Sequence, residues 1–211
     1  MSAEVPAKRR GRKGNPAARR QAILEAAIEQ FLAQGFAATT LESVARQAGV
    51  AKGTIYLYFA DKEALFRALV QDIAGPVIGE AEATVPAFTG PFPVLARQLV
   101  LGLVRQVLQT HRKRLLQLVI TEAPRFPWLA EIYWQEVVSR ALATIRAVAR
   151  QAVARGELAS PVLERFPQLL PAPLLIGFLW TTLFQRFEPL DLEAFVETYV
   201  DLLLRGLEAK P

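Results

Sequence analysis

The side chains best suited to contact another molecule lie between Lys52 and Phe59, in the sequence KGTIYLYF. Ile55 and Phe59 are four residues apart and therefore share the inward face of a short helix. The outer faces are left with Gly53, Thr54, Tyr56, Leu57 and Tyr58. Large apolar and aromatic groups exposed on so short a helix cost solubility unless a partner covers them. The segment therefore predicts a binding surface.

A second helical pattern precedes this segment and positions it. Its inward face is formed by residues at three- and four-residue spacing: Leu41, Val44, Ala45 and Ala48. Thr39 and Glu42 have the spacing of a capping box, so we expect this helix to begin near Thr39. Gly49 follows where the helix must stop, because glycine tolerates the left-handed backbone of a tight helix exit. Two short helices meeting across a glycine are typical of a helix-turn-helix.

In this register, residues 36–66 resemble the DNA-binding domain of the TetR/AcrR family of bacterial transcriptional regulators. The matching positions are Thr39-Thr40, Val44-Ala45, Ala48-Gly49-Val50, Lys52-Gly53-Thr54, Tyr56-x-Tyr58-Phe59 and Lys62-Glu63-x-Leu65. Each match alone is weak evidence, but all of them together in one register are specific.

The resemblance implies that the helix from Lys52 enters the DNA major groove, where side chains reach base edges and phosphates. The residues nearest base edges would be Gly53, Thr54, Tyr56 and Leu57, and those gripping phosphates would be Thr40, Tyr58 and Lys62. The alternative for the two tyrosines is ordinary packing with the hydroxyl in water, and for Lys62 a solvated lysine. Within this register we favour contact with DNA for the whole set, Lys52 included.

Positive charge is concentrated at the N-terminus. The whole chain carries a formal net charge of +5, whereas residues 1–20 alone sum to +6. Residues 1–15 contain two glycines and no apolar run, so they predict a flexible basic arm. The arm is either a solubilising tail or a segment that lies along phosphates or in the minor groove. Beside a helix-turn-helix we favour the second interpretation.

The rest of the chain shows helical periodicity without strand alternation or repeats. Asn15-Pro16 opens a first helix that Gly35 ends, and Asp61 caps a fourth helix that Gly75-Pro76 should break or kink. Further helices are expected at residues 94–110, 112–123, 127–155, 174–187 and 191 onward. We therefore expect an all-α chain. The resemblance assigns residues 16–62 to a three-helix helix-turn-helix DNA-binding domain and 63–211 to a helical effector-binding and dimerisation domain.

The segment from Phe166 to Gln185 contains no charged residue. Its apolar part, residues 169–184, is too short for a membrane span, which needs about 20 apolar residues. A helix that is apolar on all sides must be covered by protein, and the family's last two helices form a four-helix bundle between subunits. The expected homodimer interface comprises Gly177, Trp180, Thr181, Phe184, Tyr199 and Leu203. The alternative is packing within one subunit.

Aromatic residues in the middle of the chain suggest a site for a small apolar or aromatic effector. The candidate lining residues are Trp128, Tyr133, Trp134 and Phe178, with Trp180 beside them. Aromatic residues at helical spacing are equally often part of the core, so both interpretations stay open. Prolines near Pro124 and at Pro171 and Pro173 oppose uniform packing of these helices and favour a mainly apolar cavity.

Composition excludes several classes of function. The 211 residues are 52% hydrophobic, enough for a large core. One histidine and no cysteine cannot make a common zinc site or a disulfide, and no glycine-rich phosphate loop appears. Ser43, Ser139 and Ser160 have no neighbouring base readable from spacing. We expect no catalytic residue, metal or cofactor and, without a secretory signal, a cytoplasmic protein.

Two functions remain. The first is a dimeric, ligand-responsive repressor that binds a palindromic double-stranded DNA operator. The second is a helical dimer that uses the same surface for a protein partner and does not bind an operator. The hydroxyl and ammonium donors around the turn and the basic arm favour the first, because a protein partner would not require phosphate-directed donors.

Overall fold

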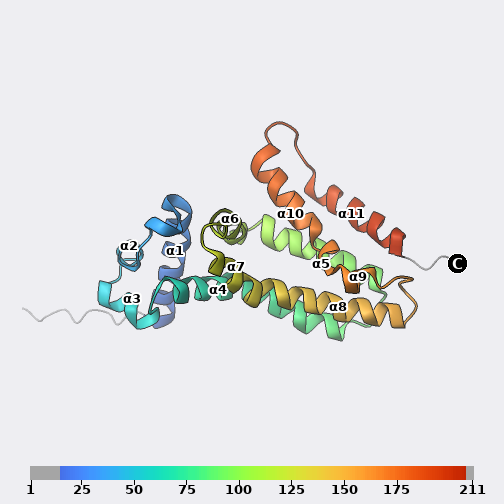
Figure 1. The fold of residues 1–211 in the computed structure, drawn as a ribbon, viewed down its shortest axis with the longest axis horizontal. Coiled ribbons are helices and arrows are strands. Elements are labelled where there is room, and N and C mark those ends of the chain that lie inside the picture. Colours follow the sequence, from blue (N-terminus) through green and yellow to red (C-terminus); the bar gives the residue numbers. More distant parts are fainter. Residues whose placement is uncertain (1–14, 208–211) are drawn as a thin grey trace, which may run out of the picture. The chain divides into compact units, whose positions relative to one another are not determined.

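The computed structural model describes residues 15–207, and within this range the chain is helical with no β-strand (Figure 1). Contacts divide the chain into two compact units, Met1–Leu65 and Phe66–Pro211. The all-α expectation is confirmed. The expected basic arm falls almost wholly on residues 1–14, which lie outside the described residues, and the proposed ranges 16–62 and 63–211 stay a prediction.

Helix α1 (Pro16–Ala38) begins as the sequence predicts. The Asn15 side chain accepts a hydrogen bond of 3.0 Å from the Ala17 N–H, and Pro16 occupies the first turn, where its missing N–H costs nothing. Gly35 leaves the helical conformation with φ of 82°, so the regular helix stops there and a last short turn follows. The buried face of α1 includes Ile23, Leu24, Ala27, Ile28 and Phe31.

Helix α2 (Leu41–Gln47) starts with a different capping box from the one we expected. Thr40 Oγ1 accepts from the Ser43 N–H at 3.1 Å, and Ser43 Oγ accepts from the Thr40 N–H at 3.1 Å. Thr39 is fully buried, and its hydroxyl donates to the Gly35 carbonyl at 2.9 Å. The expected Thr39–Glu42 box was therefore wrong by one residue, because Thr39 is used to close the end of α1.

Helix α3 (Lys52–Tyr58) follows the predicted turn. Gly49 adopts φ of 67°, and the Val50 N–H returns to the Ala45 carbonyl at 3.0 Å, which terminates α2. Ile55 and Phe59 are buried, as their spacing predicts. The sequence therefore correctly identifies which side of α3 faces the core.

The second unit contains the rest of α4 (Lys62–Ala87), which begins in the first unit with Asp61 accepting from the Ala64 N–H at 2.7 Å. Gly75-Pro76 does not break α4, which runs on to Ala87, and the expected kink stays a prediction. Pro76 has no N–H to offer the carbonyl of Asp72, so this turn lacks one backbone hydrogen bond. The following helices are α5 (Phe92–Leu108), α6 (Lys113–Glu122), α7 (Pro127–Tyr133), α8 (Ser139–Ala154), α9 (Val162–Arg165), α10 (Ala172–Leu179) and α11 (Leu192–Leu207).

Two π-helical turns interrupt helices that the sequence predicts as continuous. Trp134–Val138 joins α7 to α8, and Trp180–Phe184 continues α10. Each turn starts at a tryptophan, and a π turn inserts an extra residue that rotates all side chains after it. A period of 3.6 residues cannot reveal such an insertion, so the faces expected beyond Trp134 and Trp180 were not reliable.

The core of the second unit forms where α5 packs against α8, α10 and α11. Figure 1 shows α10 and α11, joined by one loop, beside α5. Arg97 pairs with Asp201, and Arg105 Nε lies 2.7 Å from Glu193 Oε1, so two ion pairs connect α5 to α11. Arg140 Nε donates to Glu82 Oε1 at 2.9 Å and links α8 to α4.

A stability measurement tests the revised cap of α2. Ser43→Ala should lower the free energy of unfolding by about 1 kcal/mol, because the Thr40 N–H and the Gln30 side chain lose the Ser43 hydroxyl. Urea denaturation measures the change. Gln47→Ala is the control in the same helix, since it removes only an exposed bond to Glu29 and should change stability by less than about 0.5 kcal/mol. Equal effects would contradict the Thr40–Ser43 cap.

Candidate functional site

The outer face of α3 exposes the side chains that the sequence singles out. Leu57 is 84% exposed and Tyr56 is 45% exposed, although both are large. Lys52 and Gly53 are exposed beside them, and Thr54 and Tyr58 are partly buried. An apolar side chain as exposed as Leu57, flanked by a tyrosine and a lysine, indicates a surface that meets another molecule.

Glu42 of α2 holds two of these side chains. The Tyr56 hydroxyl donates to Glu42 Oε1 at 2.8 Å, and Lys52 Nζ lies 3.0 Å from the same oxygen. The backbone hydrogen bond at Glu42, then Tyr56, then Lys52 lower the pKa of this carboxyl to about 2. Glu42 in turn raises the pKa of Lys52 and of Tyr56. The sequence did not reveal this network, because we assigned Glu42 to the cap of its own helix.

Tyr58 and Lys62 contact α1. The Tyr58 hydroxyl donates to the Pro16 carbonyl at 3.3 Å. Lys62 Nζ donates to the Phe36 carbonyl at 2.9 Å and to the Ala37 carbonyl at 3.4 Å, and lies 4.6 Å from the centre of the Phe36 ring. Burial lowers the pKa of Lys62. An ammonium has three donors, so Lys62 closes the end of α1 and keeps one donor for a phosphate. Its phosphate contact stays a prediction.

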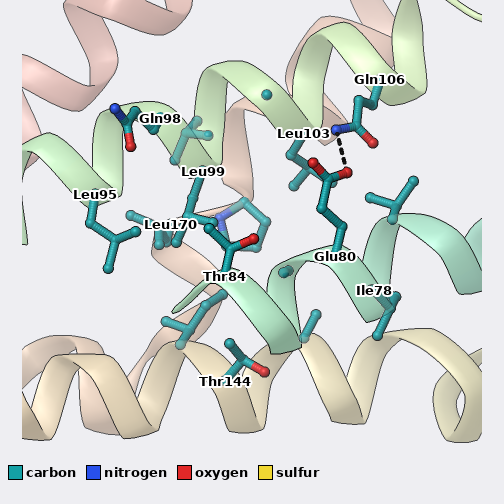
Figure 2. Close-up of a pocket in the computed structure, with 17 residues that line it drawn as sticks. Ile78, Glu80, Thr84, Leu95, Gln98, Leu99, Leu103, Gln106, Thr144 and Leu170 are labelled. Carbon is teal, nitrogen blue, oxygen red and sulfur yellow. Dashed lines mark hydrogen bonds between the residues drawn. The ribbon is translucent and has the colours of Figure 1, made fainter. Parts of the chain in front are cut away.

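The second unit contains a cavity of about 300 Å³ between α4, α5 and α8. Its wall is mainly apolar and includes Ile78, Leu95, Leu99, Leu103 and Ile145, with Leu170 and Pro171 at one end. Figure 2 shows the polar side chains that interrupt this wall: Glu80 and Thr84 from α4, Gln98 and Gln106 from α5, and Thr144 from α8. An apolar space with a few polar groups is typical of a small-molecule site.

None of the aromatic residues expected to line a pocket lines this cavity. Trp128 packs edge-on against Phe66 with ring centres 5.9 Å apart, and Phe178 is buried in the core. Trp134 is 53% exposed, and burial raises the pKa of Tyr133 to about 12. Aliphatic residues of α4 and α5 form the wall instead, and helical spacing in the sequence does not distinguish them from core residues.

Large apolar side chains are exposed along α10, its π turn and the residues that follow, and we call this set the α10 face. Its members are Leu175, Ile176, Leu179, Leu183, Phe184 and Phe187. Of the residues expected at an interface, only Phe184 belongs to this face. A Cβ on Gly177 would lie 2.5 Å from Cδ1 of Leu192 and 3.1 Å from Cδ1 of Leu108, so this glycine permits packing inside the subunit.

The other expected interface residues also have contacts within the chain. Tyr199 donates to the Leu169 carbonyl at 2.6 Å, and Leu203 packs against the core. The Trp180 indole donates to the Glu188 carbonyl at 2.8 Å, and the Thr181 hydroxyl donates to the Gly177 carbonyl at 2.7 Å. Contact with a second subunit stays a prediction for these residues.

Two sequence profiles match the chain. The profile "Bacterial regulatory proteins, tetR family" matches residues 23–69, and "Tetracyclin repressor-like, C-terminal domain" matches residues 89–203. The HTH-type transcriptional regulator AcrR of Shigella flexneri is 37% identical over 103 residues, which are 48% of this chain and 47% of AcrR. SrpR of Pseudomonas putida is 30% identical over 142 residues, 66% of this chain and 63% of SrpR. These matches span less than two thirds of either relative.

Solved structures share the fold over almost the whole chain. NalD of Pseudomonas aeruginosa, the secondary repressor of the MexAB-OprM multidrug efflux pump, has a TM-score of 0.73 and 26% identity, covering 93% of this chain and all of NalD. The SmeT–triclosan complex has a TM-score of 0.76 and 22% identity, covering 92% of this chain and 93% of SmeT. In the described range 15–207, no helix combines the length and hydropathy of a membrane span.

The acidity of Glu42 tests the network on α3. Tyr56→Phe removes one hydrogen bond to the carboxylate and should raise the pKa of Glu42 from about 2 towards its ordinary 4.5. Because the folded-state pKa is lowered, the stabilisation by this group is present above pH 4.5 and is lost as the pH falls towards 2. NMR titration of the glutamate side chains measures the pKa of Glu42, and urea denaturation at several pH values measures the change in stability. An unchanged pKa in Tyr56→Phe would show that the hydroxyl does not bind Glu42.

Proposed function

Because the chain belongs to the TetR family of bacterial regulatory proteins, which regulate transcription and are not enzymes, we propose that it is a dimeric, sequence-specific DNA-binding repressor. A small apolar molecule that occupies the cavity of the second unit releases it from its operator. The observation that carries this proposal is the exposed outer face of α3, with Leu57 and Tyr56 directed away from the core.

The chemistry of α3 suits the DNA major groove. Leu57 offers an apolar contact to a thymine methyl group. The Tyr56 hydroxyl donates its hydrogen to Glu42 and offers its oxygen as an acceptor for a base amino group. Lys52 and the N-terminus of α2 at Thr40 supply positive charge and N–H donors beside them. Glu42 holds Tyr56 and Lys52 in place before DNA arrives, which reduces the entropy lost on binding.

Dimerisation brings two copies of α3 to the two half-sites of a palindromic operator. The α10 face supports this step, since Leu183, Phe184 and Phe187 would otherwise remain in water. Helix α11 lies next to α10 and exposes Leu202. In this proposal, these two helices of each subunit form the four-helix bundle that the family resemblance implies for the homodimer.

Coupling between effector and operator runs through α4 in this proposal. Val77, Ile78 and Ala81 of α4 line the cavity, whereas the first residues of the same helix belong to the DNA-binding unit. Gly75-Pro76 lies between these two parts of α4, at a turn with one backbone hydrogen bond fewer. An effector shifts the dimer away from DNA only by as much as it prefers the conformation that does not bind DNA. NalD, which is 26% identical to this chain, is the secondary repressor of a multidrug efflux pump, which supports an apolar effector in this proposal.

Substitutions on α3 distinguish contacts that recognise the base sequence from contacts that bind phosphates. Tyr56→Ala should cost about 1–3 kcal/mol of operator binding and reduce the preference for operator over random DNA. Lys52→Ala should weaken binding to both DNAs alike and lower the salt slope by about one phosphate contact. Fluorescence anisotropy at several salt concentrations measures both. Unchanged operator binding in Tyr56→Ala and Leu57→Ala would exclude α3 as the reading helix, whereas absence of operator binding by the unaltered chain would favour a protein partner.

Sedimentation of an acidic variant tests the α10 face. Leu179→Glu with Leu183→Glu should give monomers, because two charges would have to be buried without partners. Both side chains are exposed within one subunit, so the fold itself should survive. Ile120→Glu, an equivalent change on α6, is the control and should leave the dimer intact. A dimer that persists in the double variant would remove this face from the interface.

Filling the cavity tests its role. Gly102 lines the cavity, and a Cβ built there meets no atom within 4 Å. Gly102→Phe should therefore fold, bind the operator and lose its response to effectors, because the ring occupies their space. Gly102→Ala is the matched control: it should retain the response and gain up to about 1 kcal/mol of stability from helix propensity. Effector-induced release from DNA that is equal in both variants would place the effector elsewhere.

A further inference from the structure

Glu80 is the one charged residue among those lining the cavity of the described second unit. The rest of the wall is aliphatic except for small hydroxyl and amide groups. Apolar walls favour the hydrocarbon part of any guest about equally, so they distinguish guests mainly by their size. The charge of Glu80 is therefore the feature best able to distinguish one guest from another.

The geometry leaves this carboxylate available. Glu80 Oε2 accepts a hydrogen bond of 3.3 Å from Gln106 Nε2, across the space between α4 and α5 (Figure 2). Among the described residues no arginine or lysine pairs with Glu80. The contrast within the same unit is clear: Glu82, Glu193 and Asp201 each have an arginine, from Arg140, Arg105 and Arg97.

A carboxylate with only a neutral amide beside it keeps lone pairs for another donor. Glu80 is exposed, so a guest that brings a positive charge gains a Coulomb attraction that solvent partly screens. A carboxylate on the guest would instead face a like charge. The Gln106 amide fixes the position of Glu80 without neutralising it.

We propose that Glu80 makes this cavity selective for apolar molecules that carry a positive charge, such as alkylammonium or aromatic amine compounds. The inference rests on the proposed function, since it names the chemical class of the effector for the same cavity. Glu80 acts as the counter-ion of the guest, and the aliphatic residues of α4, α5 and α8 hold its hydrocarbon part.

The test compares three probes with the same hydrocarbon tail: decyltrimethylammonium, 1-decanol and decanoate, each below its micelle concentration. Isothermal titration calorimetry measures their binding to the full chain and to Glu80→Gln, which keeps the size and the partner Gln106. Glu131→Gln is the matched control, because Glu131 is an exposed carboxylate on α7 that does not line the cavity. Gly102→Phe reports whether binding occurs in the cavity.

The cation should bind the full chain more tightly than decanol by roughly fivefold, the upper range for a partly solvated ion pair, and decanoate should bind weakest. Glu80→Gln should remove this order, and Glu131→Gln should preserve it. Equal binding of all three probes, lost in Gly102→Phe, would overturn the charge selection and leave the effector cavity intact. Absence of binding by any probe, or binding unaffected by Gly102→Phe, would overturn both the selection and the cavity's proposed role.

Discussion

The burial of Ile55 and Phe59 is the constraint on which the DNA-binding unit depends. These two side chains fix the rotation of α3 about its axis, and every other residue of this short helix takes its direction from them. Leu57 must then face solvent although it is apolar. Leu57 stays exposed, despite the unfavourable contact with water, because the packing of Ile55 and Phe59 allows α3 no other orientation. A surface imposed in this way persists without a partner, so it is ready when DNA arrives.

In the second unit, too, the packing of one side of a helix determines which side chains are left exposed. Helix α5 packs on α8, α10 and α11, and ion pairs hold α11 in place. This arrangement buries Phe178 and Gly177 on one side of α10 and leaves Leu179, Leu183 and Phe184 on the other. One helix therefore closes the core of its own subunit and presents an apolar surface outward. The cavity lies between α4, α5 and α8.

Local sequence patterns predicted the first unit well because the interactions that begin, end and orient its helices are short-range. The helix start at Asn15-Pro16, the left-handed turn at Gly49 and the inward spacing of Ile55 and Phe59 each depend on residues within a few positions. The errors arose where the partner lies farther along the chain. Thr39 closes α1 and not α2, Glu42 reaches Tyr56, and Lys62 reaches the end of α1.

The second unit was harder to predict because the packing between its helices determines which side chains are buried. The π turns at Trp134 and Trp180 change which faces point inward, and no periodicity in the sequence marks them. For the aromatic residues the sequence left a pocket and the core open as alternatives; Trp128 packs against Phe66, Phe178 is buried and Trp134 is exposed. Gly177 was expected at a subunit interface, and the side chains that approach it, Leu192 and Leu108, belong to its own subunit.

The central claim is that the outer face of α3 reads a DNA sequence. Selecting bound fragments from genomic DNA with the purified protein, and sequencing them, tests this claim most directly. The account predicts a small set of fragments that share one palindromic sequence, whose two halves are spaced to meet two copies of α3 on one face of the duplex. Fragments without any shared sequence, retained only through their phosphates, would contradict it.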